Sequence, residues 1–250
     1  MEVSLKDRVA LVTGGTRGIG AAIVKQFAAS GARVVTNYRN QEQAEKFQAE
    51  MKKAGYDIHI YQADVSDFEA CKKLIADVEK DVGPLDILVN NAGVTQDTTL
   101  RKMTKEQWDT VLRINLDSVY NVSRNIIEGM LERGYGRIIN ISSINGQKGQ
   151  VGQSNYAAAK AGMHGFTMAL AQETRAQGYY SEHGFTRLYC HRHGRWQVPE
   201  DVREKIIAQI PVARLGTPEE IAELVTYVAS DKAGFITGAD ISANGGQHMM

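Results

Sequence analysis

Short, uninterrupted apolar runs alternate with segments of helical periodicity along most of this chain. The runs lie at residues 9–12, 33–38, 58–61, 85–89 and 137–141, and such runs are typical of strands buried on both faces of a parallel sheet. Helical patterns lie at residues 19–29, 44–54, 68–82 and 105–131, and a further helix begins near Asn155. This alternation predicts the α/β class: a single-domain, Rossmann-type, doubly wound parallel sheet with helices on both faces.

Composition and charge narrow the class of protein further. Residues 1–250 suit a single domain, and 43% hydrophobic with 23% charged residues excludes a disordered or fibrous chain. The 29 basic and 29 acidic side chains cancel, so neither nucleic acid nor a membrane surface is an expected partner. Two cysteines, a charged N-terminus and the lack of a long apolar run predict a cytoplasmic protein.

A glycine-rich loop follows the first predicted strand and leads into the first predicted helix. Its glycine spacing is looser than Gly-x-Gly-x-x-Gly, but its place between a strand and a helix favours a dinucleotide site. There the backbone can approach a pyrophosphate, and the helix N-terminus offers free N–H groups. The candidate cofactor contacts in this loop are Gly14, Thr16, Arg17, Gly18, Ile19 and Gly20.

The end of the second predicted strand bears on which dinucleotide binds. An acidic residue there would hold a free ribose 2′-hydroxyl, whereas an arginine accommodates a 2′-phosphate. The strand ends without an acid and is followed by Arg39, which Arg17 could assist, so NADP(H) is the predicted cofactor. A solvated surface arginine is the alternative interpretation of Arg39. Asp64 and Val65 follow the third strand and are predicted to meet the adenine, although Asp64 could instead cap a helix.

Three polar residues near the fifth predicted strand form a candidate catalytic set. Ser143 follows that strand, at the edge where open α/β sheets bind ligands. Tyr156 and Lys160 lie four residues apart, hence on one face of the next helix. A lysine cation near a phenol lowers the phenol's pKa from about 10 and suits it to give a proton to a carbonyl. Tyr-x-x-x-Lys alone is common on surface helices. The prediction of a catalytic site therefore rests on its combination with Ser143 and the glycine-rich loop.

Together these motifs resemble the short-chain dehydrogenase/reductase family over nearly the whole chain. The matching pieces are residues 13–20, residues 90–93, Asn115, Ser143 and residues 156–160. The resemblance implies that Tyr156 is the general acid and also contacts the cofactor. It implies that Lys160 tunes Tyr156 and bonds the nicotinamide ribose, and that Ser143 bonds the substrate carbonyl.

The resemblance also assigns roles to an asparagine and to a loop, and it implies no metal. Asn115 would shape its helix and hold a water in a proton relay. Asn91, Ala92 and Gly93 would lie along the cofactor. The alternatives are an ordinary polar residue inside a helix for Asn115 and a simple turn around Asn91.

A narrower resemblance concerns two segments, residues 145–156 and 238–249. They are similar to those of the acetoacetyl-CoA reductases within this family, which use NADPH to make (R)-3-hydroxybutanoyl-CoA for polyhydroxybutyrate synthesis. By that resemblance Asp97, Gln150 and Gln153 contact an acyl-CoA substrate, and the protein is a homotetramer. The alternative is that these three are ordinary polar loop residues that contact no ligand. Two other functions stay open: a 3-oxoacyl-(acyl-carrier-protein) reductase, and an NADP-binding regulator that has lost the chemistry.

Residues 175–197 break the pattern. A sixth parallel strand ending in a Pro-Gly turn is expected here, yet the segment contains neither Val nor Ile. One interpretation is a metal cluster at Cys190, His191 and His193, but the family uses no catalytic metal. The favoured interpretation is a shifted reading frame, because dropping one base from Tyr179 onward permits Ile-Thr-Val-Asn-Thr-Val-Ser-Pro-Gly.

Overall fold

In a computed structural model of the chain, the described residues are 3–174 and 200–249. Within them, five parallel strands form one sheet in the order β3-β2-β1-β4-β5. The strands are β1 (Val9–Val12), β2 (Arg33–Tyr38), β3 (Ile58–Gln62), β4 (Ile87–Asn90) and β5 (Arg137–Asn140). The strand order reverses direction between β1 and β4, where open α/β sheets bind ligands at the carboxyl ends of their strands. The predicted fold class is confirmed.

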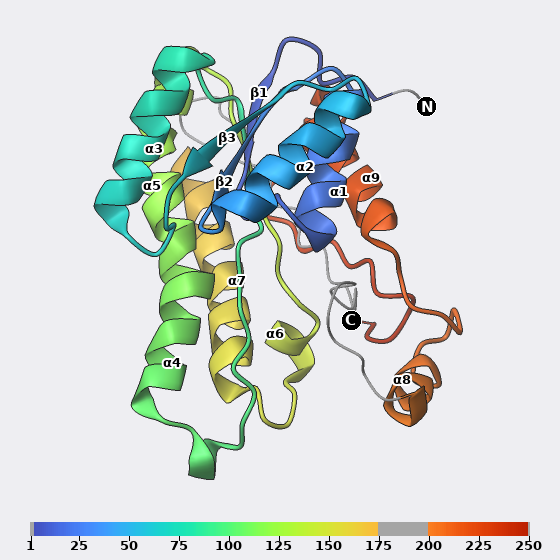
Figure 1. Ribbon diagram of the computed structural model, residues 1–250. Helices are drawn as coiled ribbons and strands as arrows, with labels where there is room; N and C mark the ends of the chain where they lie inside the picture. Colours follow the sequence, from blue (N-terminus) through green and yellow to red (C-terminus); the bar gives the residue numbers. More distant parts are fainter. Residues whose placement is uncertain (1–2, 175–199, 250) are drawn as a thin grey trace.

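Helices cover both faces of the sheet (Figure 1). On one face lie α1 (Gly18–Ala29), α2 (Gln41–Lys53) and α9 (Pro218–Ala229). On the other lie α3 (Phe68–Asp81) and α5 (Ser118–Arg133), with α7 (Ser154–Thr174) packed beside α5. The shorter helical elements are η1 (Leu100–Lys102), α4 (Lys105–Leu112), α6 (Asn145–Lys148), α8 (Glu200–Ile207) and η4 (Asp231–Ala233).

The central strand, β1, is apolar at every position because both of its faces are covered. All four residues of β1 are fully buried. Ala10 and Val12 pack into the core beneath α1 and α9, whereas Val9 and Leu11 pack into the core beneath α3 and α5. Because successive side chains of a strand point to opposite faces, a strand covered on both faces needs apolar residues at every position.

The helical stretch predicted over residues 105–131 is confirmed, but its middle is not α-helical. There α4 gives way to a π-helical segment, Arg113–Asp117, before α5 begins. A π turn adds one residue to the helical repeat, and such bulges occur mostly at functional sites. Asn115 lies inside this segment.

Several sequence predictions fall on residues 175–197, which lie outside the described residues. They are the sixth strand, the Cys190, His191 and His193 cluster, and the shifted reading frame. Among the residues that the structure describes, no group of three or more His, Cys, Asp or Glu side chains could hold a metal ion. Within the same ranges, no helix is long and apolar enough to cross a membrane.

Candidate active site

The glycine-rich loop is held against the end of β2 by two hydrogen bonds. The Gly14 N–H donates to Asn37 Oδ1 at 3.0 Å, and the Gly15 N–H donates to Thr36 Oγ1 at 2.8 Å. Gly14 has a φ of 63°, in the left-handed region that favours glycine. These contacts fix the path of the loop above the sheet, so its backbone is positioned before any ligand arrives.

Asn91, just after β4, closes the other side of the loop. Its Nδ2 donates to the carbonyl oxygens of Thr13 at 2.8 Å and Gly14 at 3.2 Å. A Cβ atom at Gly20 would lie 2.5 Å from that same Nδ2, so a larger residue would displace the Asn91 side chain from these two carbonyl oxygens. The structure therefore brings the loop and the segment around Asn91 together, as the sequence motifs predict.

The start of α1 fits an anionic group. Its N-cap residue, Arg17, makes no side-chain capping hydrogen bond, and its first turn holds no acidic residue. A Cβ atom at Gly18 would meet nothing within 4 Å, so the backbone is open to an approaching group there. Free N–H groups and the positive end of the helix dipole favour a phosphate at such a place. The chain's own residues thus fit the pyrophosphate of a dinucleotide.

Arg39 and Asp64 lie together at the ends of β2 and β3. Arg39 Nη1 is 3.9 Å from Asp64 Oδ2, and the two side chains are 55% and 45% exposed. Partial burial raises the pKa of Asp64, but hydrogen bonds from Ser66 and the charge of Arg39 outweigh it and leave that pKa lowered. The alternative that Asp64 caps a helix is wrong, because Asp67 caps α3 by accepting from the Ala70 N–H at 2.8 Å. Val65 is buried beside this pair.

Tyr156 and Lys160 lie on one face of α7. Lys160 is 3% exposed, and its Nζ lies 5.7 Å from the centre of the Tyr156 ring. The same Nζ donates a 2.7 Å hydrogen bond to the carbonyl oxygen of Ile141, just after β5. A cation held this close to a phenol stabilises the phenolate form.

Ser143 is the third residue after β5 and is 7% exposed. Its Oγ accepts a hydrogen bond from the backbone N–H of Asn145 at 3.2 Å. The preceding Ser142 has a different environment, because its Oγ donates to the carbonyl oxygen of Lys160 and lies 3.1 Å from His164 Nε2. Of the two serines, Ser142 ties the loop to α7, and Ser143 is the candidate for contact with a ligand.

Asn115 holds the loop that follows β4. It is fully buried, and its Nδ2 donates to the carbonyl oxygens of Val94 at 2.9 Å and Val111 at 2.8 Å. Its Oδ1 accepts from the Val94 N–H at 3.2 Å and would lie 2.6 Å from a Cβ at Gly93. The side chain thus holds the segment containing Ala92 and Gly93 in place. Asn115 therefore has a specific structural role, unlike the ordinary helix-interior residue of the alternative interpretation.

Two of the three predicted substrate contacts meet. Gln153 Nε2 donates to Asp97 Oδ2 at 2.7 Å, and the Thr98 N–H donates to the carbonyl oxygen of Gly152 at 2.8 Å. Gln150 lies exposed on the same loop, where its carbonyl oxygen accepts from the Gln153 N–H at 3.1 Å. The loops before η1 and before α7 therefore form one surface beside Tyr156.

Sequence reasoning missed two buried asparagines beside the candidate catalytic residues. Asn155 is fully buried, its Oδ1 accepts from the Tyr156 N–H at 2.8 Å, and its Nδ2 donates to the carbonyl oxygen of Gln96 at 3.3 Å. Asn145 is 6% exposed, and its Nδ2 donates to Gln153 Oε1 at 2.6 Å. Each lies at the start of a helix in a polar stretch of sequence, which gives no signal of burial, so only the fold shows them.

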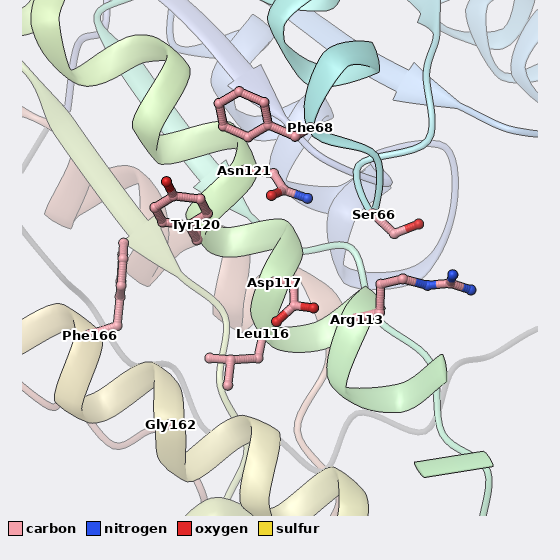
Figure 2. Close-up of a pocket in the computed structure, with 9 residues that line it drawn as sticks. All are labelled: Ser66, Phe68, Arg113, Leu116, Asp117, Tyr120, Asn121, Gly162 and Phe166. Atoms are coloured by element: carbon pink, nitrogen blue, oxygen red, sulfur yellow. The ribbon is translucent and has the colours of Figure 1, made fainter. Parts of the chain in front are cut away.

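A cavity of about 540 Å³ opens elsewhere, lined by residues from the start of α3, the π-helical segment, α5 and α7 (Figure 2). The rings of Phe68 and Tyr120 stack there with centroids 6.1 Å apart. The other lining residues are Ser66, Arg113, Leu116, Asp117, Asn121, Gly162 and Phe166. None of the candidate catalytic residues lines this cavity.

Comparison with known proteins points in the same direction as the geometry. A family model described as short chain dehydrogenase matches residues 8–179. An acetoacetyl-CoA reductase of Shinella zoogloeoides is 53% identical over 243 residues, 96% of this chain and 98% of that protein. A Rhizobium meliloti protein of the same name is 54% identical over 244 residues, 97% of this chain and 99% of the other. A 3-oxoacyl-(acyl-carrier-protein) reductase of Pseudomonas aeruginosa is 40% identical over 250 residues, 99% and 100% of the two chains.

Proposed function

The chain belongs to the short-chain dehydrogenase family, and from that premise we propose that it reduces acetoacetyl-CoA to (R)-3-hydroxybutanoyl-CoA with NADPH. The observation that carries the proposal is the placement of Lys160 Nζ 5.7 Å from the Tyr156 ring, on a helix to which Ser142, the neighbour of the buried Ser143, is hydrogen-bonded. A phenol, a cation and a hydroxyl gathered at the carboxyl edge of a sheet that also holds a phosphate loop suit carbonyl reduction.

The reaction adds one hydride and one proton across the C3 carbonyl of the substrate. When bound, the reduced nicotinamide cofactor supplies the hydride to the carbon. Tyr156 gives its phenolic proton to the carbonyl oxygen, which becomes the hydroxyl of the product. Ser143 donates a hydrogen bond to that oxygen while negative charge develops on it. The phenolate left on Tyr156 is stabilised by the ammonium of Lys160, and a water bound at Asn115 would belong to the relay that returns a proton.

The choice of NADP(H) rests on Arg39 and Arg17. The family and its fold imply a nicotinamide cofactor, and by their places in the sequence both arginines are candidates to bind a 2′-phosphate. Arg39 is half exposed and has only the distant Asp64 carboxylate as an ion-pair partner within the part of the chain that the structure describes. Its guanidinium can therefore turn to a phosphate without breaking a short salt bridge.

The proposed thioester contacts are Asp97, Gln150 and Gln153, on the two joined loops beside Tyr156. Supply of the hydroxyacyl-CoA to polyhydroxybutyrate synthesis, in the cytoplasm, is the corresponding physiological role. A carrier-protein thioester is the second candidate substrate, because a relative at 40% identity bears that name. We expect kcat/KM to be higher for acetoacetyl-CoA than for acetoacetyl-carrier protein. A clear preference for the carrier protein, measured by NADPH oxidation at equal thioester concentrations, would favour the second candidate.

A homotetramer is the proposed assembly. The outer faces of α5 and α7 leave large apolar side chains in contact with solvent, including Tyr120 at 52% and Met168 at 55% exposed. The cavity beside Tyr120 lies on the same faces (Figure 2). An apolar area of this kind is typical of an interface between subunits. Light scattering coupled to gel filtration tests the assembly, and a monomeric mass would contradict it.

A further inference from the structure

A chain of side-chain hydrogen bonds connects the exposed loop before η1 to the buried serine. Asp97 Oδ2 accepts from Gln153 Nε2 at 2.7 Å, and Gln153 Oε1 accepts from Asn145 Nδ2 at 2.6 Å. The backbone N–H of Asn145 then donates to Ser143 Oγ at 3.2 Å. The chain spans three separate segments, because Asp97 follows β4, Asn145 begins α6 and Gln153 precedes α7 (Figure 1).

The carboxylate at one end fixes the orientation of both amides. An ionised carboxylate only accepts hydrogen bonds, so Gln153 must turn its NH₂ group toward Asp97 and its oxygen toward Asn145. Asn145 must then turn its own NH₂ group toward Gln153. Its Oδ1 faces the other way and has no hydrogen-bond partner among the described residues, although the residue is 6% exposed. A buried polar atom left in this way is uncommon in native structures, so a water or a ligand group is expected to meet it.

The same asparagine determines what the Ser143 hydroxyl can do. Because Ser143 Oγ already accepts from the Asn145 N–H, its own hydrogen is left for a carbonyl oxygen. Rotation of the Asn145 side chain away from Gln153 would loosen this turn and move its N–H. The second tie between the two loops, from the Thr98 N–H to the carbonyl oxygen of Gly152, keeps the Asp97 end of the chain in place.

We propose that Asn145 is a positioning residue for carbonyl reduction, which couples the Asp97–Gln153 pair at the thioester to the orientation of the Ser143 hydroxyl. The inference rests on the proposed function, since it takes Ser143 as the group that bonds the substrate carbonyl. Asn145 itself acts through Ser143 and needs no contact with the reacting atoms.

The test exchanges acceptors and donors along the chain. Asn145→Asp places a second acceptor against Gln153 Oε1, and turning Gln153 around would set that oxygen against Asp97. We expect kcat to fall about tenfold, as for the loss of one hydrogen bond in the transition state, with the Kd of NADPH unchanged. Adding Asp97→Asn reverses the direction of donation along these hydrogen bonds. The amide introduced at position 97 can donate to Gln153, which can then donate to the carboxylate introduced at position 145. The double variant should recover most of the kcat lost in Asn145→Asp, while loss of the Asp97 carboxylate from the thioester site should appear as a higher KM.

A second arm shows that the effect passes through Ser143. In a Ser143→Ala background, Asn145→Asp should lower kcat by less than about twofold, because coupled residues are not additive. Asn125→Asp, the same change on α5 away from the site, is the matched control. If Asn145→Asp does not fold, Gln153→Leu removes the same contact from a half-exposed position and should behave alike. Wild-type kcat in Asn145→Asp, equal losses in both backgrounds, or no recovery in the double variant would overturn the inference. Failure of the wild-type protein to oxidise NADPH with acetoacetyl-CoA would instead overturn the proposed function.

Discussion

Lys160 on α7 donates a 2.7 Å hydrogen bond to the carbonyl oxygen of Ile141, the residue that follows β5. This bond ties the helix that carries Tyr156 to the edge of the sheet. A buried ammonium is costly unless it is hydrogen-bonded, and here a backbone dipole supplies part of that stabilisation. The contact therefore holds a cation beside the Tyr156 ring by means of the fold itself, before any cofactor or substrate is bound.

Tyr156→Phe should lower the rate of NADPH oxidation by acetoacetyl-CoA by at least about a hundredfold, the usual scale for loss of a general acid. The change removes one oxygen and keeps the ring volume. We therefore expect the thermal unfolding midpoint and the affinity for NADPH to stay close to wild type. Steady-state assays and NADPH fluorescence titrations measure these quantities. An unchanged rate would show that Tyr156 is not the proton donor.

Arg39→Ala should weaken NADPH binding about ten- to a hundredfold and NADH binding much less. Loss of a charge-assisted pair costs about 1.5–3 kcal/mol, and only NADPH carries the 2′-phosphate. Titration of the fluorescence of each reduced cofactor gives the two Kd values. Lys46→Ala, which removes an exposed cation from α2, is the matched control and should change neither. Equal weakening of both cofactors by Arg39→Ala would remove Arg39 from the phosphate site.

The sheet and the phosphate loop could be predicted from the sequence because each depends on neighbouring residues. A strand such as β1, buried on both faces, needs an apolar residue at every position, and such a run is visible locally. A loop that must adopt the left-handed conformation at Gly14 and leave no room for a Cβ at Gly20 needs glycine at those positions.

The features that the sequence did not predict depend on contacts between distant residues. The π-helical segment is fixed by Asn115, whose side chain reaches back to Val94 as well as to Val111. The hydrogen bonds from Asp97 through Gln153 to Asn145 join residues 56 and 8 positions apart. Local periodicity contains no information about such partners, and a buried asparagine looks like any polar loop residue until the fold is known.

Glu220→Gln should flatten the pH dependence of stability in acid. Hydrogen bonds from Arg214 and from the Thr217 N–H lower the pKa of Glu220 to about 2. The unfolded-state pKa is higher, so this contribution to the free energy of unfolding is fully present above about pH 4.3 and is lost as the pH falls toward 2. The side chains of Arg214 and Glu220 are 55% and 43% exposed, so solvent screening limits the effect to about 1 kcal/mol or less.

Glutamine at position 220 can still complete the capping box with Thr217, so the variant isolates the charge from the cap at the start of α9. Urea unfolding at pH 7 and pH 3 measures the difference between the two proteins. That difference should shrink at pH 3. Glu219→Gln, an exposed neighbouring acid, is the control and should show a smaller change between the two pH values. A wild-type advantage that grew on acidification would contradict the assignment.

The remaining prediction concerns residues 175–197, which lie outside the described residues and whose sequence departs from the family pattern. A buried parallel strand containing Glu182, His183 and Arg187 would bury unpaired charge, at several kcal/mol each, against a whole-domain stability of about 5–15 kcal/mol. The shifted frame removes these residues and restores Val-Asn-Thr-Val-Ser-Pro-Gly. We therefore expect peptide mass spectrometry of the active protein from its natural source to find that peptide. A tryptic peptide spanning Leu188 to Arg192 as written, in protein that reduces acetoacetyl-CoA, would refute the shifted frame. It would also reopen the interpretation of Cys190 as part of a metal cluster.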